Sequence, residues 1–138
     1  AKSLAEANLT KAGAADKGTV YIVAPNDGTA RAIADAFAAD KAVTKYFVTG
    51  QDAEKASVQY IIDGKQSMTV LKDVRTLVKD AITAALSFLK SETPAKTTTY
   101  DNGVKVVPSY LLEPMALGVG DIEKVLVESG YYSADQLK

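Results

Sequence analysis

The chain reads TVYIVAPNDGTARAIADAFAAD from Thr19 to Asp40, and this stretch decides the fold. Its first six residues are almost wholly apolar and mostly β-branched, as is typical of a strand buried on both faces. The polar residues Asn26, Asp27 and Gly28 come next. From residue 29 to 39 the apolar side chains return at helical spacing. We therefore expect a β-strand, a polar turn and an α-helix in direct succession.

The same succession occurs twice more along the chain. Strands are expected at 46–49 and 67–71, with a helix at 53–63 after the first and a longer one at 73–90 after the second. The longer helix carries an apolar stripe over four turns. Such alternation predicts an α/β fold with a parallel sheet. A short helix is expected before this core, at residues 2–12.

The C-terminal third breaks this regularity. Asn102 and Gly103 lie between two β-prone runs, 97–100 and 104–107, and Asn-Gly in that position is a strong hairpin signal. Two prolines then bracket an extended segment, and a short helix is expected at 122–128. We therefore expect a C-terminal β-hairpin, an extended segment and a short helix to follow the parallel βαβ units.

Composition excludes several classes of function. The 138 residues carry a formal net charge of −1 and include no Cys, His or Trp. A Ser-His-Asp triad, a thiol nucleophile and the usual zinc sites all need residue types that are missing. Near-neutral charge gives no sign of an electrostatic nucleic-acid binder. We expect a protein that is not an enzyme, with no cofactor, no metal and no nucleic-acid partner.

Polar side chains follow each of the three predicted strands, as Asn26-Asp27, Gln51-Asp52 and Lys72-Asp73. The carboxyl ends of parallel strands share one edge of the sheet, where ligands bind. The simpler interpretation makes Asn26, Asp27 and Asp52 helix caps and Lys72 a solvated charge. A cation at a helix start opposes the helix dipole, however, so Lys72 calls for an anionic neighbour or a ligand. Amide, carboxylate and ammonium groups together suit the hydroxyls of a sugar.

Three segments carry a resemblance to a known family: APNDGTARAI (24–33), VTGQDAEKASVQYIIDGKQSMTVLKD (48–73) and NGVKVVPSYLLEP (102–114). They resemble the type I periplasmic sugar-binding proteins of bacterial ABC transporters, in the xylose/glucose-type branch. The resemblance implies that Asn26, Asp52 and Lys72 hydrogen-bond the sugar, and that Asp27 and Gln51 support them from behind or cap helices. Leu71 and Asp73 stand where the family more often has Tyr and Pro.

The resemblance also implies how the chain is organised. It covers the C-terminal portion of such a protein, which is less than half. Residues 1–72 would supply βαβ units of the C-terminal lobe, and residues 73–108 a helix and hairpin that pack on the other lobe. Residues 109–138 would form the return crossing and the C-terminal helix. The helical stripe at 73–90 would then need the N-terminal half, carried by a separate chain, or self-association.

The function implied is capture of a monosaccharide for import through a membrane permease, without bond-breaking chemistry. The expected location is the periplasm. In bacteria that lack a periplasm, it is the outer surface, with a lipid anchor. Two alternatives remain. The sugar-effector domain of a repressor-type transcriptional regulator shares the two-lobed fold. A flavodoxin-like or Rossmann-like enzyme is the other alternative, and the missing GxGxxG motif and the missing His count against it.

Overall fold

The computed structural model describes residues 1–137 and divides into two compact units. The first unit comprises Ala1–Leu71 and the segment that begins at Met115, and the second comprises Lys72–Pro114. The chain therefore leaves the first unit after its third strand and returns to it at Met115.

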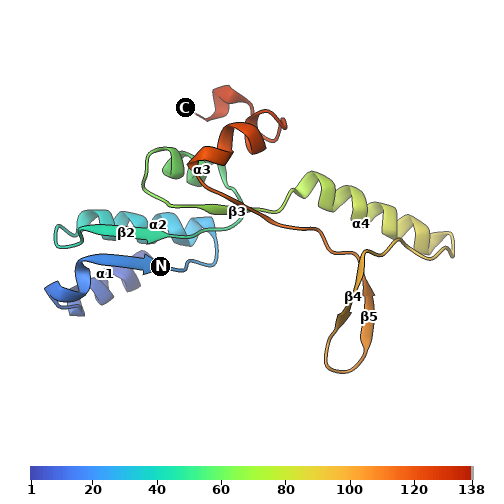
Figure 1. Cartoon of the computed structure of the whole chain (residues 1–138), viewed down its shortest axis with the longest axis horizontal. Coiled ribbons are helices and arrows are strands. Elements are labelled where there is room, and N and C mark those ends of the chain that lie inside the picture. Colours follow the sequence, from blue (N-terminus) through green and yellow to red (C-terminus); the bar gives the residue numbers. More distant parts are fainter. Residues whose placement is uncertain (138) are drawn as a thin grey trace. The chain divides into compact units, whose positions relative to one another are not determined.

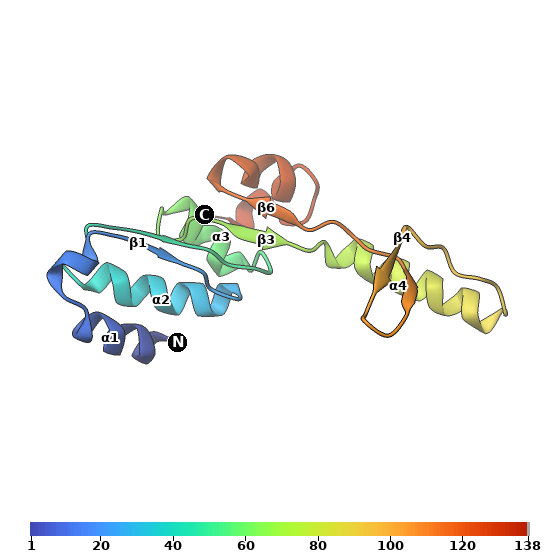
Figure 2. The ribbon, with the colours of Figure 1, turned by 60° about the horizontal axis from the view of Figure 1, so that its bottom comes forward.

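The first unit is built on a parallel βαβ element. Strands β1 (Thr19–Ile22) and β2 (Lys45–Val48) pair in parallel, and α2 (Asp27–Ala39) connects them. Figure 2 shows α2 along one face of this sheet and α1 (Lys2–Lys11) beyond α2. The small residues Ala30 and Ala34 let α2 lie close to the sheet, where they are buried with Ala24 and Val48. The predicted strand-turn-helix succession is confirmed.

The third strand has a partner that the sequence analysis missed. Helix α3 (Lys55–Ile62) leads to β3 (Thr69–Leu71), which pairs antiparallel with β6 (Met115–Leu117). Just before β3, the Ser67 amide donates to the carbonyl of Val48 at 3.0 Å. The sequence analysis expected no strand at β6, because three residues between a proline and a glycine are too few for a period-2 pattern.

The C-terminal segment closes the core of the first unit. A 3₁₀ turn (Val119–Asp121) precedes a π-helical turn (Glu123–Val127), and a second 3₁₀ turn covers Ala134–Gln136. The short helix expected at 122–128 is thus present with π winding. It buries Ile122 and Leu126 in one cluster with Ala53, Val58, Ile61, Leu71 and Leu117.

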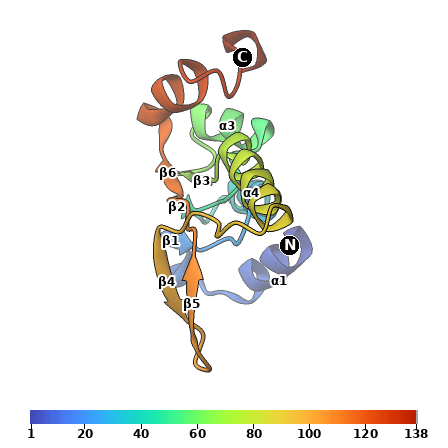
Figure 3. The ribbon, with the colours of Figure 1, turned by 90° about the vertical axis from the view of Figure 1, so that its right-hand side faces the viewer.

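The second unit contains a long helix and a β-hairpin, which are drawn in Figures 1 and 3. Asp73 caps α4 (Val74–Leu89), accepting a hydrogen bond from the Arg75 amide at 2.9 Å. Strands β4 (Thr98–Asp101) and β5 (Val106–Ser109) pair antiparallel. The Asn102 side chain accepts from the amides of Val104 and Lys105, and Gly103 has a positive φ. The predicted Asn-Gly hairpin is confirmed.

Helix α4 leaves its apolar side uncovered. All 16 of its residues are described, and none is buried. Ile82 is 56% exposed, and Leu77, Val78 and Leu86 are exposed to about the same degree. The stripe that predicted this helix is therefore largely uncovered within the second unit.

Candidate functional site

Asn26 lies at the turn between β1 and α2. It is exposed and is the N-cap of α2, where its Oδ1 accepts a hydrogen bond from the Thr29 amide at 2.9 Å. An N-cap residue usually has its backbone in the β region, and its side chain accepts from the amide two or three residues later. Capping uses one lone pair of Oδ1 and does not involve the Nδ2 donor. The cap interpretation is therefore correct, and it is compatible with a ligand contact.

Asp52 lies in the loop of residues 51–54, between β2 and α3. Its side chain is exposed, and its backbone has a φ of +102°, while buried Ala53 has a φ of +48°. Helix α3 begins at Lys55 with Glu54 as N-cap, so Asp52 is not the cap of that helix. The loop presents the Asp52 carboxylate at the surface of the unit from an uncommon backbone conformation.

Four successive residues of this loop are held by hydrogen bonds. Gln51 accepts from the Asp27 amide at 2.9 Å, and the Asp52 amide donates to Val70 at 2.8 Å. The Ala53 amide donates to the Thr69 hydroxyl at 3.1 Å, and its carbonyl accepts from Tyr132 at 2.9 Å. The Glu54 amide donates to the Asp27 carboxylate at 2.8 Å. The turn carrying Asn26 and Asp27 and the 51–54 loop are therefore joined directly.

Asp27 is the centre of these contacts and is fully buried, with an exposed fraction of 0%. Its Oδ1 accepts from Gln66 Nε2 at 2.9 Å and from Thr69 Oγ1 at 2.8 Å, and its Oδ2 accepts from the Glu54 amide. Burial raises the pKa of Asp27 above the ordinary value for Asp, and these donors oppose the rise. Although it opens α2, Asp27 serves the neighbouring loop and not the helix cap.

Lys72 directly follows β3 and is the first residue of the second unit. It is exposed, and it lines a groove of about 540 Å³ between α4 and residues 110–114, together with Leu77, Ala81 and Leu111. Asn26 and Asp52 belong to the first unit. The meeting of Lys72 with those two side chains at one ligand stays a prediction.

Membership of a known family follows from a match to its model. The periplasmic binding protein domain matches residues 1–93 of the 138. The chain belongs to this family. The predicted α/β fold of a type I periplasmic binding protein is thereby confirmed, since solved binding proteins of this kind superpose on it.

Two solved structures cover 99% of the chain. A carbohydrate transporter solute-binding protein from Chloroflexus aurantiacus, in complex with D-glucose, is 65% identical with a TM-score of 0.94. An ABC transporter solute-binding protein from Clostridium phytofermentans, with bound β-D-glucose, is 35% identical with a TM-score of 0.83. The chain spans 40% and 43% of these proteins, respectively.

The sequence relatives are also named as periplasmic proteins that bind sugars. The multiple sugar-binding periplasmic receptor ChvE of Rhizobium radiobacter is 55% identical over 93 residues, covering 66% of this chain and 26% of the relative. A D-xylose-binding periplasmic protein of Haemophilus influenzae is 33% identical over 116 residues, covering 84% of this chain and 35% of the relative. The chain thus spans well under half the length of these relatives.

Within residues 1–137, no three side chains of Asp, Glu, His or Cys gather in a way that could hold a metal ion. No helix in the described part of the chain is both long and apolar enough to cross a membrane.

The sequence analysis missed three residues that hold the site. Thr69, Gln66 and Tyr132 all bond to Asp27 or to the 51–54 loop, from positions well separated from it in the chain. Thr69 and Gln66 are buried. A buried polar residue within or beside an apolar strand is the one signal that could have pointed to Thr69.

Proposed function

We propose that this chain is the C-terminal portion of a solute-binding protein that captures a monosaccharide for ABC-type import. It binds the sugar without breaking bonds. Family membership and the sugar-binding names of the relatives support this function. The observation that carries it is the direct hydrogen bonding of the 26–27 turn to the 51–54 loop, at the carboxyl ends of neighbouring parallel strands. Ligands of open α/β sheets bind at such an edge.

Three side chains contact the sugar in this proposal. The Asp52 carboxylate accepts hydrogen bonds from hydroxyls, the Lys72 ammonium donates them, and Asn26 contributes its amide nitrogen. Hydrogen bonds that involve a charged group are stronger and shorter than neutral ones, which suits a ligand that is also well solvated by water. Asp27 and Gln51 lie behind these residues and make no contact with the sugar.

The opposite wall of the site comes from the N-terminal half of the protein, on the same polypeptide or on a separate one. Closure of two lobes then excludes water from the sugar, and the loaded protein delivers it to a membrane permease. We place it in the periplasm, or on the outer surface with a lipid anchor. The solved relatives are named as transporter solute-binding proteins and the sequence relatives as periplasmic sugar-binding proteins, which favours this function over a repressor effector domain.

The decisive experiment compares sugar binding by the complete two-lobed protein and by its Asp52→Ala and Lys72→Ala variants. Isothermal calorimetry with D-glucose and D-xylose is the measurement. Each substitution removes a charged hydrogen bond, which is worth about 1.5–3 kcal/mol, so affinity falls about 10- to 150-fold. Asp16→Ala, at an exposed position in the 3₁₀ turn Ala14–Lys17, is the control and leaves affinity unchanged. Wild-type affinity in both site variants contradicts the assignment.

A further inference from the structure

We propose that the Asp27 carboxylate, together with Gln66 and Thr69, is a positioning group that fixes the backbone from which Asp52 reaches its ligand. The inference rests on the proposed function for the ligand, but its structural part concerns only the described residues of the first unit. Asp27 does not touch the ligand. It acts through the backbone of residues 53 and 54.

The backbone of the 51–54 loop needs such support. Asp52 and Ala53 both have positive φ, a region that residues with a Cβ rarely adopt and that costs free energy unless the surroundings impose it. Here the surroundings do impose it. The amides of Asp52, Ala53 and Glu54 each donate to a fixed acceptor, and two of those acceptors are Thr69 Oγ1 and Asp27 Oδ2.

Thr69 connects the Ala53 amide to the Asp27 carboxylate. Its hydroxyl accepts from the Ala53 amide at 3.1 Å and donates to Asp27 Oδ1 at 2.8 Å. A hydroxyl has a single proton, so the bond to Asp27 leaves its lone pairs directed at Ala53. The carboxylate therefore holds the Glu54 amide directly and the Ala53 amide through Thr69, in two successive peptide groups.

The side-chain amide of Gln66 is oriented with its NH₂ group toward Asp27. It is 3% exposed, and its Nε2 donates both to Asp27 Oδ1 and to the Met68 carbonyl. Its Oε1 is buried and has no hydrogen-bond partner among the described residues. Leaving an acceptor unpaired in the interior is costly, and rotating the amide would place that oxygen against the carboxylate instead. The orientation that serves Asp27 is the one adopted.

An amide at position 27 cannot keep all three hydrogen bonds of the carboxylate as they stand. All three partners of the Asp27 side chain are donors: Gln66, Thr69 and the Glu54 amide. Asn has one acceptor oxygen and one donor nitrogen. If its oxygen faces Gln66 and Thr69, its NH₂ group faces the Glu54 amide, which can only donate, and that contact is lost. If its oxygen faces Glu54, both Gln66 and Thr69 must turn round to accept from the NH₂ group, so the two present contacts are replaced. A nearly isosteric change therefore alters the support of the loop without opening a cavity.

The test uses the complete two-lobed protein and two matched pairs of variants. Asp27→Asn is compared with Asp35→Asn, at an exposed position of the same helix where the new amide oxygen still accepts from Tyr60. Thr69→Val is compared with Thr69→Ser, which keeps the hydroxyl. The Thr69 pair keeps the proposal testable if Asp27→Asn fails to fold. The readouts are amide hydrogen exchange at Ala53 and Glu54 and the affinity for D-glucose, both measured well below the melting temperature.

We expect Asp27→Asn and Thr69→Val to speed exchange at Ala53 and Glu54 and to weaken D-glucose binding by roughly 10-fold, because the loop is no longer pre-organised. Asp35→Asn and Thr69→Ser leave both readouts near wild type. A purely structural role lowers the melting temperature but leaves affinity unchanged, and that result overturns the proposal. If the wild-type protein binds neither D-glucose nor D-xylose, the proposed function fails, and exchange alone then decides whether Asp27 fixes the loop.

Discussion

At the scale of single residues, Asn26 and Asp27 are neighbours of nearly the same size with opposite environments. Asn26 is exposed and caps α2, whereas Asp27 is fully buried and bonds to another loop. The sequence shows two adjacent helix-capping residues and does not distinguish them. What separates them is a contact with Thr69 and Gln66, about forty positions along the chain. A local sequence pattern therefore cannot predict side-chain roles that depend on partners far along the chain.

The buried carboxylate of Asp27 predicts a pH dependence of stability. Burial raises its pKa in the folded state above that in the unfolded state, and the nearby Glu54 carboxylate adds to the rise. The folded state then binds a proton at pH values where the unfolded state has lost it. The contribution of Asp27 to the free energy of unfolding is therefore fully present below about pH 4 and is lost as pH rises through the folded-state pKa.

This dependence is measured as a difference between wild type and Asp27→Asn, by urea denaturation from pH 3.5 to 7. The stability of wild type relative to the variant falls as pH rises across the lower part of that range. Surface carboxylates such as Asp40, whose pKa the bonded Lys17 lowers, respond in the opposite direction but are common to both proteins and cancel. A difference that is constant or that grows with pH contradicts the prediction.

Gly50 gives a steric test of the same site. A Cβ at this position would overlap with Asp27 Oδ1 and Gln66 Nε2. We expect Gly50→Ala to push the carboxylate away from the loop and to destabilise the protein by about 1–3 kcal/mol, as overpacking does. For a domain of this size, that lowers the melting temperature by several degrees, which a thermal scan measures.

The control for Gly50→Ala is Gly28→Ala in the first turn of α2. A Cβ there would lie 3.8 Å from Asn26 Oδ1, an ordinary van der Waals contact. Ala is the better helix former, so this change leaves stability unchanged or raises it by up to about 1 kcal/mol. Equal melting temperatures for the two variants would contradict the prediction, because displacing the Asp27 carboxylate would then cost no stability.

At the scale of elements, the sequence predicts what local periodicity determines and misses what depends on long-range pairing. Helix α4 and the β4–β5 hairpin are predicted because an apolar stripe and an Asn-Gly turn lie within each element. Strand β6 and the π winding of Glu123–Val127 are missed because both depend on packing against β3 and its cluster. For the site, the positions of Asn26 and Asp52 at strand ends are predicted, but the hydrogen bonds that hold them are not.

The uncovered side of α4 leads to a prediction about assembly. Ile82 lies in the middle of the apolar stripe and is 56% exposed in the structure. Ile82→Lys therefore costs this chain little stability by itself, but it prevents the helix from packing on a second lobe. Thr76→Lys, which adds the same charge on another side of α4, is the matched control. Co-purification with the separately expressed N-terminal half measures the effect, and retained assembly of Ile82→Lys contradicts it.

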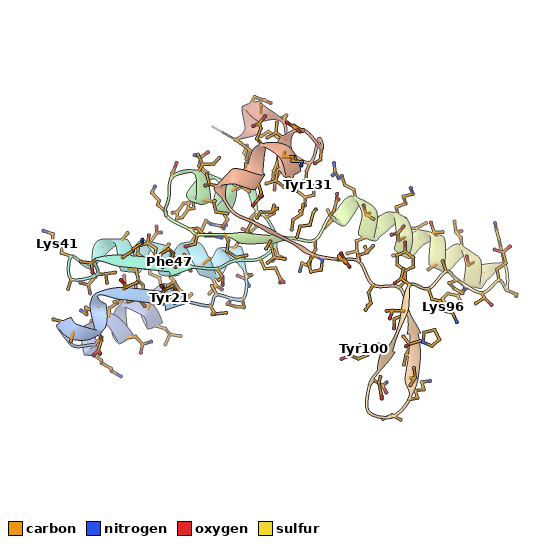
Figure 4. The ribbon with its side chains drawn as sticks, viewed as in Figure 1. Tyr21, Lys41, Phe47, Lys96, Tyr100 and Tyr131 are labelled. Carbon is orange, nitrogen blue, oxygen red and sulfur yellow. The ribbon has the colours of Figure 1, made fainter. Side chains whose placement is uncertain are left out.

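At the scale of the whole molecule, each unit leaves an apolar surface without a cover. The second unit exposes the stripe of α4. In the first unit, α2 covers one face of the β1–β2 sheet, and on the other face the rings of Tyr21 and Phe47 stack at 5.1 Å (Figure 4). Tyr21 is 76% exposed and Val23 is 89% exposed. Contiguous apolar surface of this kind marks an interaction site. The chain spans about two fifths of its solved relatives, and we propose that the remaining part of such a protein covers these surfaces.

The chain expressed by itself is therefore expected to associate with copies of itself or to remain poorly folded. Sedimentation velocity over a range of concentrations measures its mass. We expect a mass above that of one chain, with a concentration dependence, since burial of the α4 stripe and of the open sheet face stabilises any complex that covers them. Addition of the N-terminal half should convert these species into one complex of defined mass with a sharper thermal transition. The contradicting result is a monomer that unfolds cooperatively and has the same melting temperature with and without that half. It would show that the α4 stripe and the open sheet face need no partner.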